Sequence, residues 1–247
     1  MAGSMNQLNP NVDVFNRDAA GNQGYLYTAT DRLSSRMATE TSTRAVLSLG
    51  AFAGRRVLDV GCGDGFYALR YWDRGRPSAW EAVDPAPEAI AVAEGSKGTR
   101  PITFRVADGH TLPYGDDAFD VVLLQSVLHH DDDPFSMVRE AFRVAPTVVI
   151  HDPNGYNPVL KVLERVMTYH REHNEKSYSS RRLRNWVHRA GGRTVAERYA
   201  GLVPMFSPDW LARGARAMEP AVERVPMVRA VTCAVYVSLN RRIDVRG

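Results

Sequence analysis

The sequence has few cysteines and no long apolar segment, and both absences narrow the class of protein. Only Cys62 and Cys233 occur. Cys62 lies in a glycine-rich stretch that suits a structural disulfide poorly, so we expect two reduced thiols. No apolar run approaches the roughly 18 residues that a membrane-spanning helix needs. The first residues also lack the charged start and apolar stretch of a secretory signal. We therefore expect a cytoplasmic protein with no integral membrane segment.

The sequence also lacks nucleic-acid-binding motifs, internal repeats and low-complexity tracts, so we expect no nucleic-acid partner. Charge is nevertheless unevenly distributed. Residues 1–150 carry 14 basic and 19 acidic side chains, whereas residues 151–247 carry 17 and 9, a net charge of +8. Such a basic region can face an anionic substrate, a membrane surface or nucleic acid, or it can be an arginine-rich solvated surface. The sequence leaves these alternatives and the oligomeric state open.

Short apolar runs that end at Gly, Asp or Pro alternate with helical segments in the first 150 residues. The expected strands are residues 56–60, 79–83, 102–106, 119–124 and 147–150, and the expected helices are residues 31–49, 66–72, 87–94 and 134–144. This alternation is typical of a parallel sheet with helices on both faces. In such folds ligands bind beyond the carboxyl ends of the strands.

The alternation changes after residue 150. Helices are expected at residues 158–167, at 181–190 and after Ser207-Pro208, and strands at 194–199 and 230–239, with Pro220 and Pro226 interrupting the last helix. The apolar side chains of that helix either pack in the core or form a lid over an apolar substrate; they are Trp210, Leu211 and Met218. We expect an arm (1–30), a ligand-binding core (31–152) and a region of helical insertions plus two strands (153–247).

The clearest motif is the segment from Val57 to Gly65, in which a strand runs directly into three alternating glycines, Gly61, Gly63 and Gly65. Glycine lets a ligand approach the backbone closely, and the following helix directs free N–H groups at it. Dinucleotide enzymes use similar turns. Asp59 distinguishes a dinucleotide site from a site for a ligand with an ammonium group, because a carboxylate before the first glycine suits an ammonium group better than a pyrophosphate.

Two further acidic positions follow successive strands. Asp84-Pro85 ends the second strand, where a carboxylate can accept both hydroxyls of a ribose. Asp108-Gly109 ends the third strand, where a carboxylate can accept the exocyclic amino group of adenine. Each aspartate alone could be an ordinary turn residue. Together with Asp59 they predict a nucleoside-binding edge.

This order of motifs resembles the class I S-adenosylmethionine (SAM)-dependent methyltransferases, particularly their small-molecule branch. The resemblance covers residues 31–150 and rests on the glycine loop, Asp84, Ala107-Asp108-Gly109, Phe119-Asp120-Val121-Val122 and Leu128-His129-His130 followed by Asp133-Pro134. It implies a Rossmann-like α/β fold with a seven-stranded, mostly parallel sheet, an antiparallel last strand and a helical cap insertion.

The resemblance also implies a role for each motif. The three glycines would line the methionine part of SAM, Asp84 would hold the ribose and Asp108 the adenine, and Gln125 and Ser126 would lie along the cofactor. We expect a small-molecule acceptor, apolar or anionic, with transfer to oxygen favoured. Transfer to carbon or nitrogen of an isoprenoid or anionic lipid-like acceptor is the alternative. Its apolar pocket would be lined by Met205, Phe206, Trp210 and Met218.

Histidines near the strand ends are candidate proton acceptors, because histidine titrates near neutral pH. His130 ranks first, followed by His129 and by His151, which precedes Asp152; His170 and His173 could reach the site from above. The segment from His129 to Asp133 is dense in metal ligands, but helix capping explains Asp133 and we expect no metal.

Two other functional classes remain open. An NAD-dependent dehydrogenase is disfavoured by the Gly-x-Gly-x-Gly spacing and by Asp59. A SAM-binding module without catalytic activity is disfavoured by the histidines available near the strand ends.

Overall fold

The computed structural model describes residues 12–14, 16–17, 31–166 and 176–243. Its centre is one seven-stranded sheet with the strand order β3-β2-β1-β4-β5-β7-β6. Strands β1 to β5 pair in parallel, and β7 runs antiparallel to both of its neighbours, β5 and β6. The α/β, Rossmann-like fold class predicted from the sequence is therefore confirmed.

The strands form where short apolar runs end at turn residues. They are β1 (Arg56–Val60), β2 (Ala79–Asp84), β3 (Ile102–Val106), β4 (Val121–Gln125), β5 (Thr147–Pro153), β6 (Gly192–Ala200) and β7 (Val235–Arg242). Successive side chains of a strand point to opposite faces. Leu58 and Val60 accordingly belong to one buried cluster, whereas Val57, the residue before Leu58, belongs to the cluster on the other face.

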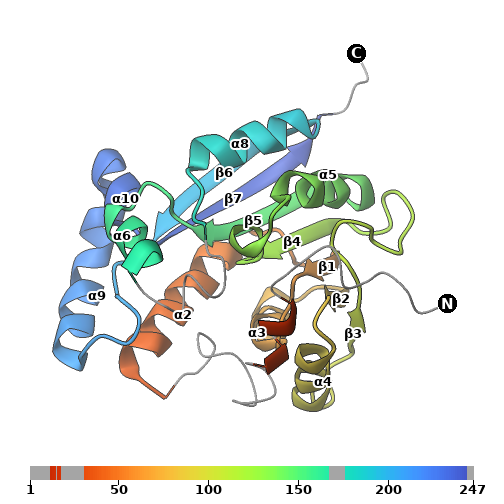
Figure 1. The fold of residues 1–247 in the computed structure, drawn as a ribbon, viewed down its shortest axis with the longest axis horizontal. Helices are drawn as coiled ribbons and strands as arrows, with labels where there is room; N and C mark the ends of the chain where they lie inside the picture. The colour runs from red at the N-terminus through yellow and green to blue at the C-terminus, as the bar shows by residue number, and fades with distance from the viewer. Residues whose placement is uncertain (1–11, 15, 18–30, 167–175, 244–247) are drawn as a thin grey trace.

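Helices cover both faces of the sheet (Figure 1). One face is covered by α5 and α8, which supply Phe142 and Trp186 to its core; the other is covered by α2, α3 and α4, which supply Val46 and Tyr71. No helix in the described part of the chain is long and apolar enough to cross a membrane. The bounds of these helices are α2 (Leu33–Leu47), α3 (Phe66–Gly75), α4 (Pro87–Ser96), α5 (Pro134–Val144) and α8 (Ser180–Arg189).

Three more helices, α6 (Pro158–Val166), α9 (Asp209–Arg224) and α10 (Pro226–Thr232), gather at the end of the sheet toward which β6 points (Figure 1). Glu219 of α9 is only 2% exposed. Its carboxylate accepts hydrogen bonds from the Thr41 hydroxyl of α2 at 3.3 Å and from the Leu202 N–H at 3.0 Å, and pairs with Arg216. Because a buried carboxylate is costly to leave unpaired, these bonds hold α9 against α2.

The structure corrects three predictions for the C-terminal region. Residues 226–232 form α10 rather than the beginning of a strand at residue 230, because Pro226 at the first helical position starts a helix despite the β-branched residues that follow. Pro220 lies inside α9 and does not interrupt it. Trp210, Leu211 and Met218 are 74%, 37% and 61% exposed, so they are not core residues.

Most of the predicted N-terminal arm lies outside the described residues, as do His170 and His173. Within the arm, residues 12–14 and 16–17 are helical. Val12 packs against Ala86 and Ala89, and the Asn16 side chain accepts a hydrogen bond from the Glu88 N–H at 3.2 Å. These contacts bring part of the arm to the start of α4, next to the loop that follows β2.

Candidate active site

The glycine loop connects β1 to α3 in a conformation that requires glycine. Gly61 and Gly65 have φ values of 75° and 76°. A Cβ atom at Gly65 would lie 2.8 Å from the Cβ of Ala93, and one at Gly61 would overlap the side chain of Val127. The loop is thus held close to both α4 and the segment after β4, and α3 begins immediately after it with its first N–H groups directed at the same edge.

Asp59 lies in β1 just before this loop and is fully buried. Its Oδ1 atom has no hydrogen-bond partner. Burial, together with the nearby charge of Asp84, raises the pKa of Asp59 to about 8. A buried carboxylate without a cation or donor is unfavourable, so a positively charged ligand group would stabilise the ionised form of Asp59, whereas a pyrophosphate would not.

Asp84 ends β2 and connects two loops. One carboxylate oxygen accepts a hydrogen bond from the Gly63 N–H at 2.8 Å, and the other accepts from the Ala86 N–H at 2.9 Å. Burial raises the pKa of Asp84 to about 6 despite these two bonds. Each carboxylate oxygen can accept a second hydrogen bond. Asp84 can therefore shape the glycine loop and still hold a ligand hydroxyl, with Pro85 half-buried beside it.

Asp108, which follows β3, is linked to the segment after β4 by His110, a residue that the sequence reasoning missed. Nδ1 of His110 lies 2.7 Å from Asp108 Oδ1, and Nε2 lies 3.1 Å from Asp131 Oδ1. The hydrogen bond to Asp131, and then the one to Asp108, raise the pKa of His110 to about 9. A protonated imidazole can donate to both carboxylates at once and so orients Asp108. Gly109 beside it is buried.

His110 could have been suspected from its position two residues after Asp108, but Asp131 is distant in sequence. Asp131 also accepts the Asp133 N–H at 2.6 Å, and its Oδ2 atom is buried without a partner. Asp133 caps α5 by accepting the Ser136 N–H at 3.2 Å, which confirms the capping interpretation of the acidic segment.

Gln125 and Ser126, at the end of β4, both contact His151 of β5. The Gln125 side-chain oxygen accepts from the Tyr71 hydroxyl at 2.9 Å, which directs its amide N–H to His151 Nδ1 at 3.0 Å. Ser126 has a φ of 53°, a strained value for a non-glycine residue, and its hydroxyl lies 3.1 Å from the same nitrogen. Strained residues of this kind are concentrated at functional sites.

His151 itself is buried, and burial lowers its pKa to about 4, so the ring is neutral. Because Nδ1 accepts the amide N–H of Gln125, the proton of the neutral ring resides on Nε2. Nε2 is buried and has no hydrogen-bond partner. His151 is therefore arranged as a hydrogen-bond donor toward the site rather than as a proton acceptor.

His129 and His130 form one short 3₁₀ turn, Leu128–His130, after β4. The buried His129 places Nδ1 2.8 Å from Asp152 Oδ1 at the end of β5, and its ring centroid lies 3.9 Å from that of the more exposed His130. A carboxylate on one ring nitrogen orients a histidine and makes the other nitrogen more basic. The two histidines are thus adjacent, and Asp152 orients the ring of His129.

The predicted apolar lid pocket is not formed by the described residues. Trp210 and Met218 are exposed, while Met205 and Phe206 are half-buried at the turn before α9, where the Arg32 guanidinium lies 5.8 Å from the Phe206 ring. A pocket of about 290 Å³ instead lies between α2 and α3 and is lined by charged and polar side chains, namely Arg36, Thr39, Glu40 and Arg70. The described residues thus form a polar pocket between α2 and α3 and no apolar pocket around Trp210 and Met218.

Comparison with known proteins identifies the family of this central region. Residues 58–147 match the family model described as a methyltransferase domain. The chain is similar to a tRNA U34 carboxymethyltransferase of Hahella chejuensis, with 31% identity over 182 residues, which are 68% of this chain and 55% of that protein. It is also similar to an uncharacterized methyltransferase of Mycobacterium tuberculosis, with 35% identity over 91 residues, 37% of this chain and 35% of that protein. The chain thus spans about half the length of the first relative and about a third of the second.

Solved structures extend the likeness of the fold to nearly the whole chain. A SAM-dependent methyltransferase from Thermotoga maritima, described as a possible histamine N-methyltransferase, superposes with a TM-score of 0.69 and 15% identity. The match covers 94% of this chain and 99% of that one. The cap helices and the last two strands therefore belong to the same architecture as the central region.

Proposed function

We propose that the chain, whose residues 58–147 match a methyltransferase domain model, transfers a methyl group from SAM to a small-molecule acceptor, most simply to an oxygen atom. The observation that carries this proposal is Asp59, a buried carboxylate with an unpartnered oxygen next to the glycine loop. The ammonium group of the methionine part of SAM supplies the charge that this position requires.

The remaining polar residues suit the rest of SAM. Gly61, Gly63 and Gly65 would line the methionine chain, Asp84 beside Pro85 would hold the ribose hydroxyls, and Asp108 beside Gly109 would accept the adenine amino group. His110 orients Asp108 for that contact through its hydrogen bonds. Gln125 and Ser126 would lie along the cofactor at the end of β4. An NAD pyrophosphate would instead meet the unpartnered carboxylate of Asp59.

SAM supplies an electrophilic methyl group, and the chain must position the acceptor, exclude water and remove a proton where transfer to oxygen requires it. We infer that His129 is a candidate proton acceptor alongside His130, because Asp152 Oδ1 lies 2.8 Å from its Nδ1 and orients the ring. His130, which ranked first from the sequence, stays a candidate, since the two rings are in contact. His151 is better suited to donating a hydrogen bond from Nε2 than to removing a proton.

A transfer assay with methyl-labelled SAM tests this proposal. The acceptor panel contains hydroxyl-bearing, amine-bearing and isoprenoid lipid-like compounds, and it also contains total tRNA, because the first relative is named for action on tRNA. We expect labelled product from a hydroxyl-bearing small molecule and a loss of product in the His129→Ala variant. Product from lipid-like compounds or tRNA alone would redirect the acceptor assignment. A protein that binds SAM but labels no acceptor class would contradict the enzymatic assignment.

A further inference from the structure

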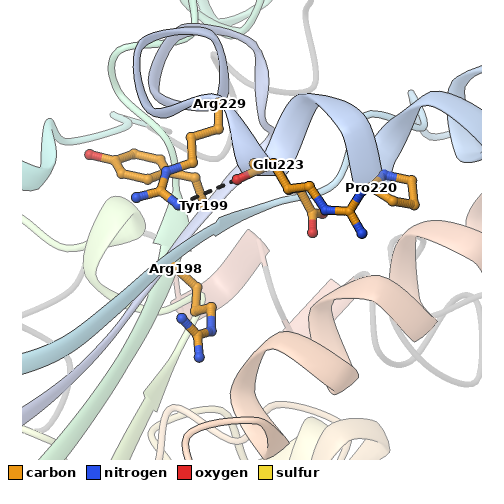
Figure 2. A pocket seen from close by; sticks show the side chains of 6 residues that line it. Arg198, Tyr199, Pro220, Glu223 and Arg229 are labelled. Atoms are coloured by element: carbon orange, nitrogen blue, oxygen red, sulfur yellow. Dashed lines mark hydrogen bonds between the residues drawn. The ribbon is translucent and has the colours of Figure 1, made fainter.

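A second pocket, separate from the predicted cofactor residues, lies where β6 meets α9 and α10 (Figure 2). It has a volume of about 330 Å³. Arg198 and Tyr199 of β6 leave the strand in opposite directions, and Pro220, Glu223 and Arg229 approach from the helices (Figure 2). Arg224 completes the lining, so three of the six side chains are arginines.

The arginines of this pocket are not neutralised by carboxylates. Within the part of the chain that the structure describes, the side chains of Arg198 and Arg224 have no hydrogen bond and no ion pair. Among the residues that the structure describes, the Arg229 side chain donates only to the backbone carbonyl of Glu223, at 3.3 Å. By contrast, Arg184 and Arg216 nearby both pair with glutamates, Glu197 and Glu219. Positive charge is therefore concentrated at the pocket although carboxylates are available in the same region.

Glu223 is the acidic residue of the lining. Its carboxylate accepts the Gly201 N–H at 3.4 Å and makes no ion pair with the surrounding arginines among the described residues. Burial raises the pKa of Glu223. Arginine guanidinium groups bind phosphate and carboxylate groups through charge-assisted hydrogen bonds, and unpaired arginines around a cavity fit such a ligand.

The register of the sheet connects this pocket to the candidate active site. One row of directly paired residues crosses four strands and consists of Gln125, His151, Val237 and Arg198. Directly paired residues of neighbouring strands point to the same face, so His151 and Arg198 share a face of the sheet. Since strands are spaced about 4.8 Å apart, the two residues are separated by about 10 Å along the row.

We propose that the pocket formed by Arg198, Arg224 and Arg229 binds an anionic group, a phosphate or a carboxylate, carried by the methyl acceptor. The link to the acceptor depends on the proposed methyl transfer, whereas the anion site itself does not. The anion would anchor one end of the acceptor at the edge strand β6. The excess positive charge of residues 151–247 then has a specific role in substrate binding.

The test is a calorimetric titration of the full chain with inorganic pyrophosphate. Each charge-assisted hydrogen bond corresponds to roughly a ten- to hundred-fold difference in affinity. We expect Arg198→Gln combined with Arg224→Gln to weaken pyrophosphate binding at least about tenfold. Neither side chain has a partner in the described residues, so the double variant should fold normally. The matched control is Arg193→Gln. Arg193 lies at the other end of β6, opposite Arg241 of β7. This variant should change pyrophosphate binding less than about twofold.

The source of the anion is distinguished with vesicles. The protein is sedimented with vesicles of phosphatidylglycerol and phosphatidylcholine. If it co-sediments, and if this binding is lost in the double variant and competed by pyrophosphate, the site binds a lipid headgroup. Pyrophosphate binding without co-sedimentation assigns it to a soluble acceptor. A control variant that weakens pyrophosphate binding as much as the double variant, or a parent protein that binds no pyrophosphate, would overturn the proposal.

SAM titrations of the same variants keep the two proposals separate. The double variant should bind SAM within about twofold of the parent, since neither arginine touches the predicted cofactor residues. Pyrophosphate binding through the pocket in a protein that binds no SAM would reject the proposed function and leave only the anion site.

Discussion

Replacing Asp59 by asparagine should stabilise the ligand-free protein and weaken its binding of SAM. The folded pKa of about 8 lies above the unfolded value of 3.8. The folded chain therefore keeps a proton that the unfolded chain releases, and stability falls as pH rises between these two values. At pH 7 the difference corresponds to on the order of 4 kcal/mol, because one pKa unit is worth about 1.36 kcal/mol. Asp59→Asn removes this cost while keeping the shape of the side chain.

The same proton links SAM binding to pH. If the SAM ammonium group binds ionised Asp59, then binding at pH 7 must release the proton that the free protein holds, roughly 0.9 per site. The affinity for SAM should accordingly rise up to about tenfold between pH 6.5 and 7.5. Asp59→Asn should bind SAM more weakly and lose this pH dependence. Asp84, whose pKa is about 6, would contribute mainly below this interval.

Calorimetry of SAM binding in two buffers with different ionisation enthalpies measures the released protons directly, and thermal unfolding between pH 4 and 8 measures stability. Asp120→Asn is a suitable control. Asp120 is half-buried at the end of β1 opposite the glycine loop, and the hydrogen bond that it accepts from the Arg56 N–H lowers its pKa. Binding of SAM without proton release, together with an Asp59→Asn variant that binds SAM as tightly as the parent, would refute the role assigned to Asp59.

Four other predictions test neighbouring parts of the site. Asp84→Ala should weaken SAM binding in titrations, and it should also cost about 1–3 kcal/mol in unfolding experiments, because two buried backbone N–H groups lose their acceptor. His110→Gln should remove up to about 3 kcal/mol of stability that the parent has below pH 6.5 and loses as pH rises through about 9, since the folded pKa lies above the unfolded 6.5; a pH-independent loss would argue for packing alone. His129→Ala should lower turnover at least about a hundredfold with SAM affinity unchanged, whereas His130→Ala should lower it less; equal or reversed effects would favour His130. Residues 204–226 should exchange amide hydrogens faster than the central strands and slow down when an acceptor binds; protection equal to that of the strands without ligand would exclude a mobile cover.

The parts of the fold that follow from local sequence were predictable. Strands β1 to β3 begin at their predicted residues, because each is a short apolar run that ends at a turn-forming residue. Strand β4 begins two positions later than predicted, at Val121, and β5 extends to Pro153. Boundaries of this kind depend on pairing with neighbouring strands, which periodicity alone does not specify.

The parts that failed depend on contacts between distant residues. Residues 230–234 were predicted to begin the last strand, but Val235 is already paired with Pro153 and Ala200, the last residues of β5 and β6, so an earlier start would have no strand partner. Pairs such as His110 with Asp131 and His129 with Asp152 are separated by 21 and 23 positions. The sequence placed these side chains at strand ends but could not show which carboxylate meets which histidine.

The central claim is that the edge formed by Asp59, Asp84 and Asp108 binds SAM, and a calorimetric comparison of SAM, S-adenosylhomocysteine and NAD tests it most directly. We expect both sulfur ligands to bind in the low micromolar range, roughly −8 kcal/mol, and to raise stability by about 2.7 kcal/mol at a hundredfold excess over the dissociation constant. NAD should bind at least a hundredfold more weakly, a difference of about 2.7 kcal/mol, because its pyrophosphate would face Asp59. Tight binding of NAD with no heat from either sulfur ligand would contradict the account.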